Sequence, residues 1–405
     1  MKIRSLTYFL NPGWPLDESK LRAAGEFLAR AKTIYETSGY EVQTTRLATI
    51  PFVKLLNGKT NETLKLTEKI SEFIQQIDVA LIALGPALIE QPHSYAVIPE
   101  AMAVSESVFF SGEMASKEKG VALAAIKACA QVIQKASAIT ADGFANLRFA
   151  ALANVKAGSP FFPAAYHDRD RPSFAVAVES ADLAVEAFNE AKTLDDGRNK
   201  LIREIEKHGK AIAQIAKNEL SNTYFSGIDF SLAPFPDDAH SLGNAIEKIG
   251  VPKIGLHGSL AAAALLTESI ERADFPHTGF SGFMQPVLED SVLAKRAAEG
   301  TLAIKDALLY SAVCGTGLDT IPLPGDTTAE QIAPLLLDLC ALSMRLDKPL
   351  TARLMPVPGK KAGDVTNFDF GFFANSKIMK LDSQSLNAPL NGDENFSLQA
   401  KRSNV

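Results

Sequence analysis

Two patterns of apolar residues alternate along most of the chain: short continuous apolar runs, and apolar residues that recur three and four positions apart. Short apolar runs such as 79–84 and 350–357 carry almost no charge, which is typical of strands buried on both faces of a parallel sheet. Between Asp17 and Gly39, apolar side chains recur three and four positions apart, which predicts an amphipathic helix with an N-cap and a glycine stop. Because strand and helix patterns alternate, the sequence predicts an α/β fold.

The same analysis predicts further elements. The predicted strands are 3–10, 40–47, 79–84, 108–111, 148–155, 174–178, 228–233, 253–256, a run ending at Cys314, and 350–357. After the first helix, the predicted helices are 61–77, 93–105, 119–136, 182–192, 197–220, 242–249, 259–273, 291–298 and 330–345. Pro99 is expected to bend the helix 93–105 or to begin a new one. Residues 383–405 are polar and aperiodic, so we expect a disordered tail after a folded domain of residues 1–382.

Two Pro-Gly stretches stand out, at 311–326 and 352–364. In each, an apolar run leads into Pro-x-Pro-Gly and then into a charge. Proline removes the donor that a ladder needs, and glycine permits a close backbone approach. We therefore expect two neighbouring strand ends whose side chains gather at one place, namely Cys314, Asp319, Asp326, Lys360 and Asp364. The alternative is two well-formed turns at a barrel rim.

These two stretches resemble the uncharacterised DUF711 family, also called UPF0210. The matching motifs, in the family's order, are 98–101, 161–167, 229–234, 257–259, 314–327 and 356–364. The resemblance covers most of the chain. It implies a fold similar to that of pyruvate formate-lyase and other glycyl radical enzymes, a single closed barrel of about ten strands surrounded by helices. It implies no reaction.

Composition excludes several classes of protein. The chain has 405 residues, of which 46% are apolar, and a net charge of -6, so it can bury a large core and carries no nucleic-acid footprint. No apolar run is long enough for a membrane span, and the first residues do not form a signal-peptide pattern. Cys129, Cys314 and Cys340 show no paired spacing, which favours a reducing, cytoplasmic setting without structural zinc. Cys129 and Cys340 lie in apolar helices and are expected to be core residues.

Three residues are the candidate catalytic groups. His257 follows a predicted strand, and Ser259 is expected at the next helix N-cap, where free N–H groups favour an anion. Alternatively, His257 satisfies a loop carbonyl. Cys314 lies directly before Gly315, and Asp319 lies later in the same Pro-Gly stretch. A free cysteine is usually a small buried hydrophobe, and Cys314 has no neighbouring cation to activate it.

Further residues are candidates for ligand binding because they lie at predicted element ends or within motifs. They are Glu100, His167, Asp229, Ser259, Gly315, Gly325, Asp326, Gly359, Lys360 and Asp364. Several acidic residues, with Glu289 and Asp290 among them, could hold a divalent metal together with His257, but no known ligand spacing supports this. The cofactor is therefore left open.

The chain departs from the family pattern in two segments. Residues 168–171, Asp-Arg-Asp-Arg, replace the small run expected after His167. Residues 367–375 contain four phenylalanines where the family usually has a glycine-rich stretch. Substrate choice is expected to differ as a result.

The sequence thus predicts an enzyme that acts on a small polar or anionic metabolite at one end of the barrel. The alternative is a non-catalytic sensor that uses the same cavity. Homo-oligomers are compatible with the sequence. We expect no glycyl radical chemistry, because Gly359 is displaced from Arg353 and is followed by a lysine. We also expect Cys314, Gly359 and His257 to lie at one end of the barrel.

Overall fold

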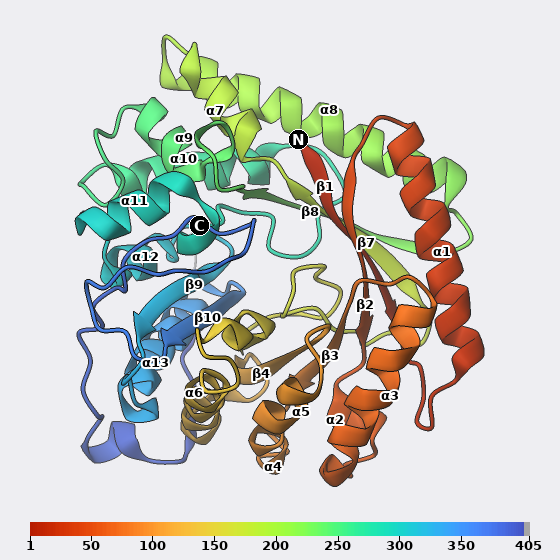
Figure 1. Ribbon diagram of the computed structural model, residues 1–405. Coiled ribbons are helices and arrows are strands. Elements are labelled where there is room, and N and C mark those ends of the chain that lie inside the picture. Colours follow the sequence, from red (N-terminus) through yellow and green to blue (C-terminus); the bar gives the residue numbers. More distant parts are fainter. Residues whose placement is uncertain (401–405) are drawn as a thin grey trace.

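Helices surround a large mixed sheet in the structure, a computed structural model that describes residues 1–400. In Figure 1 the helices form an outer ring and the strands lie inside it. The strands are β1 (Lys2–Leu10), β2 (Val42–Thr49), β3 (Leu81–Ala87), β4 (Val108–Ser116), β5 (Gly120–Ala122), β6 (Phe149–Ala153), β7 (Ser173–Glu179), β8 (Tyr224–Ala233), β9 (Gly317–Pro324), β10 (Leu350–Val357) and β11 (Asn395–Phe396).

The helices have the following bounds. They are α1 (Glu18–Thr37), α2 (Phe52–Leu55), α3 (Thr63–Gln76), α4 (His93–Ala96), α5 (Ile98–Val104), α6 (Leu123–Ala136), α7 (Ala181–Asn189), α8 (Leu194–Glu219), α9 (Leu242–Ile249), α10 (Ser259–Arg272), α11 (Ser291–Glu299), α12 (Ile304–Tyr310) and α13 (Ala329–Leu346). Short 3-10 turns lie at Thr60–Glu62, Phe144–Arg148, Asp238–His240, Val287–Glu289 and Ala388–Asn391.

The sheet contains two groups of strands that run in opposite directions. Its order is β8-β7-β1-β2-β3-β4-β6-β10-β9. Strands β1, β2, β3, β4 and β6 are mutually parallel, whereas the junctions β1–β7 and β6–β10 are antiparallel. The ends of β7, β8, β9 and β10 therefore lie where β1, β2, β3, β4 and β6 begin. This arrangement confirms the predicted α/β class.

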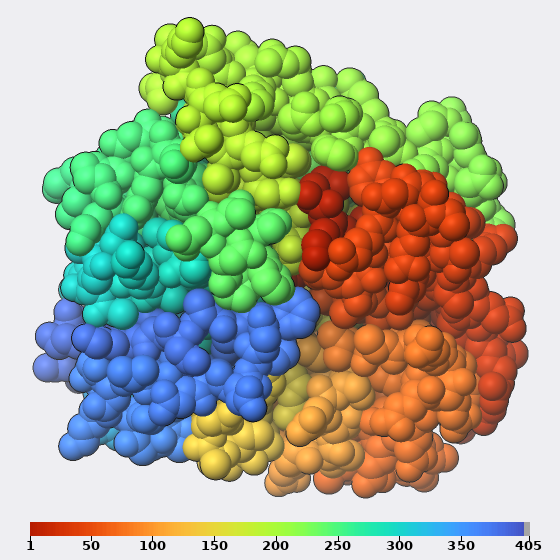
Figure 2. All heavy atoms as spheres, turned by 45° about the horizontal axis from the view of Figure 1, so that its top comes forward, coloured from red at the N-terminus to blue at the C-terminus, as the bar shows by residue number. Residues whose placement is uncertain are grey.

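Closure of a barrel is not confirmed, because the hydrogen-bonded order stops at β8 and at β9. The segment between α10 and α11 makes one isolated bridge with each of them, Ile228–His277 and Pro286–Asp319. In Figure 2, the N-terminal and C-terminal parts of the chain meet across the middle of one face.

Apolar side chains fill both sides of the sheet. The larger cluster lies between the outer sheet face and the helices and includes Leu6, Tyr8 and Leu10 of β1. A smaller cluster on the inner face includes Phe9 of β1, Phe109 of β4 and Phe162. Phe162 belongs to the long connection from β6 to β7, which lies in the middle of the ring of strands (Figure 1). Burial of the inner face explains why the strands read as continuous apolar runs.

Local signals explain several elements. Asp17 caps α1 by accepting hydrogen bonds from the backbone N–H groups of Ser19 and Lys20. Pro99 begins the separate helix α5, one of the two outcomes that the sequence allowed. Strand β10 and helix α9 have the predicted bounds.

Four local predictions were wrong. Helix α6 begins at Leu123, because residues 120–122 pair with β4 as strand β5. Residues 253–256 form no strand and make only an isolated bridge. Helix α12, which was not predicted, precedes Cys314 in place of a strand. The N-cap position of α10 is occupied by Gly258 and not by Ser259.

The expected disordered tail does not describe residues 383–400. Strand β11 pairs antiparallel with β5, and Leu123 donates its backbone N–H to Glu394. Lys127 Nζ lies 2.7 Å from the carbonyl oxygen of Asn391. The sequence did not predict this ordered segment, because backbone hydrogen bonds and charged contacts hold it in place and it has no periodic apolar face. Residues 401–405 lie outside the described part of the chain.

Candidate functional site

A cavity of about 400 Å³ lies at the end of the sheet where β1 to β4 begin and β7, β8 and β10 end. Side chains of these strands line it together with the connection after β6 and the segment after β10. Its charged lining residues are Arg4, Arg46, Glu106, Arg148, Asp229, Glu289 and Arg353. Charged groups in a largely apolar cavity are the usual mark of a binding site.

Two β-bulges turn charged residues of this site inward. Arg4 is the extra residue of a bulge in β1, where the register against β7 shifts between Ile3 and Ser5. A second shift places Asp319 and Thr320 of β9 opposite Arg353 of β10. Thr320 has a φ of 42°, which is rare for a β-branched residue. Bulges of this kind re-aim side chains near functional sites.

A chain of ion pairs joins strands β1, β7, β9 and β10 and the turn Val287–Glu289. Arg353 donates to Asp319 through Nε (2.5 Å to Oδ1) and Nη2 (2.9 Å to Oδ2). The same Nη2 donates to Glu289 Oε1 at 2.7 Å. Arg4 binds the other oxygen of Glu289 and lies 3.9 Å from Glu179. Since Arg353, Asp319 and Glu289 are at most 5% exposed, the guanidinium groups and carboxylates depend on each other.

Burial and the neighbouring arginines have opposite effects on the pKa values of Glu289 and Asp319. Burial opposes ionisation of Glu289, but Arg4 and Arg353 outweigh it and lower the pKa of Glu289. For Asp319, burial dominates over the attraction of Arg353, and the nearby Glu289 adds to it, so its pKa is raised. Arg353 stays charged, because Asp319 and Glu289 raise its pKa against the effect of burial.

Arg46 of β2 is the cavity arginine whose terminal amino groups have no hydrogen-bond partner within residues 1–400. Its Nε donates to Thr44 Oγ1 at 2.9 Å, and its Cζ lies 5.0 Å from the centre of the Phe162 ring. Within residues 1–400, no carboxylate forms an ion pair with Arg46. Burial, together with the charges of Arg4 and Arg353, lowers the pKa of Arg46. A guanidinium keeps its charge at neutral pH, so the cavity holds a cation with free donors.

Asp229 of β8 is a buried carboxylate in the wall of the cavity, 2% exposed. It accepts hydrogen bonds from Ser231 Oγ at 2.6 Å and from the backbone N–H groups of Phe280 and Ser281 at 3.0 Å each. Burial raises the pKa of Asp229, although these hydrogen bonds lower it in part. No cation forms an ion pair with it among the described residues. A buried acid with a raised pKa in a cavity is a candidate for proton transfer.

The two Pro-x-Pro-Gly turns are neighbours, as predicted. Strands β9 and β10 pair in parallel, with Pro324 opposite Val357, and Gly325 donates its N–H to Lys360 at 2.9 Å. The charged residues after the turns do not enter the cavity, however. Asp326 and Asp364 are exposed, and Lys360 is half-buried. For these residues, the structure matches the alternative of two well-formed turns at a rim.

The predicted meeting of Cys314 with Gly359 was wrong. Cys314 precedes the first residue of β9, and Gly359 follows the last residue of β10. Because these strands are parallel neighbours of eight residues each, the two positions lie at opposite ends, roughly 20–25 Å apart. Cys314 is buried in the core, where its Sγ lies 3.9 Å from Gln285 Nε2. Gly315 is buried beside it, in close backbone contact with Gly282.

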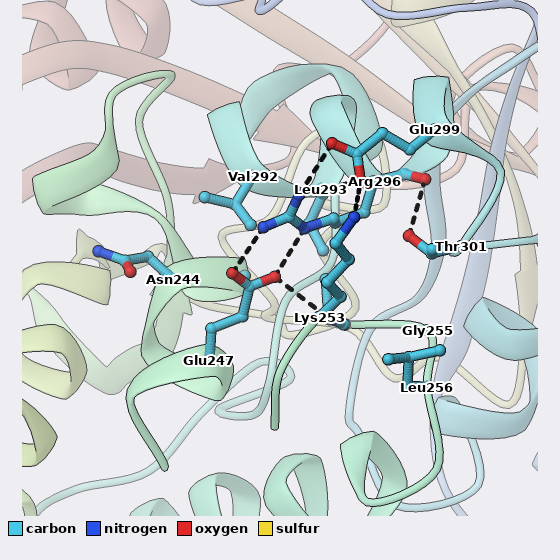
Figure 3. A network of polar contacts seen from close by, with 12 residues as sticks. Asn244, Glu247, Lys253, Gly255, Leu256, Val292, Leu293, Arg296, Glu299 and Thr301 are labelled. Atoms are coloured by element: carbon cyan, nitrogen blue, oxygen red, sulfur yellow. Dashed lines mark hydrogen bonds and ion pairs between the residues drawn. The ribbon is translucent and has the colours of Figure 1, made fainter. Parts of the chain in front are cut away.

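His257 lies on the surface, in the loop between α9 and α10, and does not line the cavity. Figure 3 shows what holds this loop. Arg296 of α11 makes a bidentate pair with Glu247 of α9, at 2.8 and 2.9 Å, and also binds Glu299. Lys253 of the loop binds Glu299 at 2.9 Å. The loop is therefore anchored by structural ion pairs.

The remaining candidates lie elsewhere. Ser259 is buried and donates from Oγ to the carbonyl of Leu256. Glu100 is exposed on α5. His167 is buried, its backbone N–H donates to Thr49, and burial lowers its pKa. Residues 1–400 contain no group of three or more His, Cys, Asp or Glu residues that could hold a metal ion.

Of the predicted site residues, the structure brings Asp229 and Asp319 to the cavity region, and sequence analysis missed the arginines. Arg4 and Arg46 lie among other polar residues of β1 and β2, but Arg353 lies inside the otherwise nearly apolar strand β10. A charge within such a strand is costly unless the inner face contains a site or a partner, so this pattern was the available signal.

Residues 1–377 match the family described as "Uncharacterised ACR (DUF711)". The chain is 28% identical over 384 residues to a UPF0210 protein of Acetivibrio thermocellus, covering 90% of this chain and 84% of that protein. It is 30% identical over 385 residues to a UPF0210 protein of Pyrobaculum aerophilum, covering 90% and 83%.

Among solved structures, an anaerobic ribonucleotide reductase aligns with a TM-score of 0.40 and 10% identity, over 95% of this chain and 74% of that one. A similarity of this size establishes neither fold nor activity. None of the helices within residues 1–400 is both long and apolar enough to cross a membrane. With a family match over nearly its whole length, the chain belongs to the uncharacterised DUF711 (UPF0210) family.

Proposed function

We propose that the protein is an enzyme that acts on a small organic anion, bound by Arg46 in the cavity. One observation carries this proposal: both terminal amino groups of Arg46 lack an acceptor within residues 1–400, although the residue is partly buried and lines the cavity. A partly buried guanidinium without a protein acceptor has donors free for a ligand in the cavity. The planar guanidinium fork fits a carboxylate or phosphate through two parallel hydrogen bonds.

Asp229 is the group to which we assign proton transfer. It lies in the wall of the same cavity, and its raised pKa brings it closer to neutrality, where acid–base groups work best. No His, Lys or Cys within residues 1–400 lines the cavity. The proposed chemistry is therefore proton transfer between Asp229 and the bound anion.

The absence of His, Lys and Cys from the described lining also favours the second candidate, a sensor that binds the anion and does not change it. In that case Asp229 has only a structural role, which its bonds to Phe280 and Ser281 would serve, because they fix the segment beside β8. The experiment below separates the two candidates.

We also infer that the segment between α10 and α11 completes the wall between β8 and β9, as a barrel requires. The isolated bridges Ile228–His277 and Pro286–Asp319 support this inference. Glycyl radical chemistry is not part of the proposal. Radical transfer needs the glycine and cysteine close together, and Gly359 and Cys314 follow and precede neighbouring parallel strands.

Calorimetric titration with propionate and with inorganic phosphate tests the binding step. We expect wild type to bind at least one of the two anions and Arg46→Gln to bind it at least tenfold more weakly, a loss of about 1.4 kcal/mol. Arg203→Gln removes an exposed arginine and is the control. Equal affinities of wild type and Arg46→Gln, or no binding of either anion, would contradict the proposal.

A second measurement separates enzyme from sensor. Wild type and Asp229→Asn are each incubated with a small-molecule extract of the cells that produced them, and anions are followed by mass spectrometry. An enzyme depletes an anion that Asp229→Asn leaves unchanged. A sensor retains the same anion in both proteins and depletes nothing.

A further inference from the structure

Aromatic rings form a large part of the cavity wall. Phe109, Phe144, Phe161, Phe162, Phe370 and Phe372 line it. They come from β4, from the turn before β6, from the connection after β6 and from the segment after β10. Four segments far apart in sequence thus each present phenylalanine to one space.

These rings are not simply core residues. Phe144, Phe161 and Phe370 are only partly buried, and Phe372 is 37% exposed. Phe370 lies 5.0 Å from Phe144 and 5.4 Å from Phe372 between ring centres. Rings that are packed on one side and open to a cavity on the other offer apolar surface to a ligand.

The charged and aromatic parts of the cavity are in direct contact. Arg46 Cζ lies 5.0 Å from the centre of the Phe162 ring, and Arg353 Cζ lies 5.7 Å from that of Phe161. A ligand group bound by Arg46 would therefore lie beside aromatic rings. An anion without an apolar part would leave this wall in contact with water.

The charge balance limits the ligand's charge. Within residues 1–400, the lining carries four arginines, Arg4, Arg46, Arg148 and Arg353, and three carboxylates, Glu106, Asp229 and Glu289. Because Arg4 and Arg353 are already paired with carboxylates and Arg46 is not, one added negative charge is tolerated better than two. A monocarboxylate therefore fits better than a phosphate dianion.

We propose that the ligand is a monocarboxylate that carries an aromatic ring. This inference rests on the proposed function, since it assigns the carboxylate to Arg46. The ring lies against the phenylalanine wall, where edge-to-face contacts favour it over a saturated group of equal size. The cavity, of about 400 Å³, falls within the range of known small-molecule sites.

Calorimetry with four probes tests the proposal. The probes are 3-phenylpropionate, propionate, 3-phenylpropan-1-ol and 3-cyclohexylpropionate. Wild type should bind 3-phenylpropionate about thirtyfold or more tightly than propionate, because the ring leaves water. The alcohol should bind at least tenfold more weakly than 3-phenylpropionate, and the cyclohexyl acid several-fold more weakly.

Variants locate the ring. Phe370→Leu should reduce the ratio between 3-phenylpropionate and propionate several-fold while leaving propionate affinity unchanged. Phe372→Ser changes an exposed residue and serves the same purpose if Phe370→Leu does not fold. Arg46→Gln should weaken both acids equally.

Two outcomes overturn the inference and leave the proposed function intact. Equal affinities for propionate and 3-phenylpropionate would show that no ring site exists, and equal affinities for the phenyl and cyclohexyl acids would show an apolar site that is not aromatic. If neither acid binds, or if Arg46→Gln binds them as wild type does, the inference and its assignment of Arg46 fall together.

Discussion

Arg353 and Asp319 lie opposite each other on neighbouring parallel strands, and a bulge in β9 lets them share two hydrogen bonds of 2.5 and 2.9 Å. Both side chains are almost fully buried. Neither charge is tolerable there without the other, since desolvating a single ion costs several kcal/mol. The first Pro-Gly stretch thus supplies a buried partner for the arginine of the second.

Asp319→Asn should destabilise the protein strongly, because it leaves the Arg353 guanidinium with one carboxylate instead of two. We expect a loss of about 3–5 kcal/mol in the free energy of unfolding, measured in urea. Asp326→Asn, two residues beyond the same strand and exposed, should change it little. Similar losses for both variants would contradict the role assigned to the pair.

Glu289→Gln should give a stability loss that depends on pH. The pKa of Glu289 is lower in the folded protein than its ordinary value of 4.5, so its ionised form stabilises the fold above that value. This contribution disappears as the pH falls through the folded pKa. The difference between wild type and Glu289→Gln should therefore be largest at neutral pH and shrink below about pH 4.5. A difference independent of pH from 7 to 3 would exclude this account.

Arg46→Gln and Arg353→Gln should differ in stability although both remove an arginine from one cavity. Arg353 neutralises two buried carboxylates, so its loss should cost about 3 kcal/mol or more. Arg46 has no ion-pair partner within residues 1–400, so the ligand-free variant should stay within about 1 kcal/mol of wild type. Urea unfolding without added anion gives both values. Equal losses would mean that Arg46 is a structural residue.

Gly325→Ala should disturb the contact between the two Pro-Gly turns. An added Cβ would lie 2.2 Å from the carbonyl oxygen of Val357, which is backbone and cannot move aside cheaply. We expect a loss of about 3 kcal/mol. The control is Gly371→Ala, where a Cβ meets nothing within 4 Å. Thermal unfolding of the two variants compares them directly, and a tolerated Gly325→Ala would argue against the close approach.

The three thiols should be unreactive in the native protein. Cys129, Cys314 and Cys340 are fully buried, and burial raises the pKa values of Cys129 and Cys340, which keeps their reactive thiolate forms rare. Ellman's reagent should label none of them on the time scale that labels all three in denaturant. Rapid labelling of one thiol under native conditions would place that cysteine at an accessible site.

Much of the fold could be predicted from local signals. The capping carboxylate of Asp17, the apolar run of β10 and the repeated Pro-x-Pro-Gly each depend on a few adjacent residues, and the structure has all three as predicted. Helix α12 was not predicted, because its seven residues are too few to show a helical period. The ordered structure of residues 383–400 was not predicted, because their pairing with β5 is a long-range contact that composition does not indicate.

The site was predicted only in part, because it also depends on long-range contacts. Asp229 and Asp319 belong to recognisable motifs, and they lie in or beside the cavity. His257 and Cys314 were chosen because they lie next to strands and glycines, yet the structure places one on the surface and the other in the core. A predicted strand end does not tell which end of the sheet a residue occupies.

By itself, the sequence determined the α/β class, the strand-terminating turns and the family, because each depends on residue types at short spacing. Only the tertiary structure decided which charges meet. Arg4, Arg46 and Arg353 come from strands separated by up to about 350 residues along the chain, and one bulge lies at Arg4 while another, in β9, lies opposite Arg353. The strength of a charge interaction depends on distance and burial, and only the folded arrangement of strands fixes these two quantities.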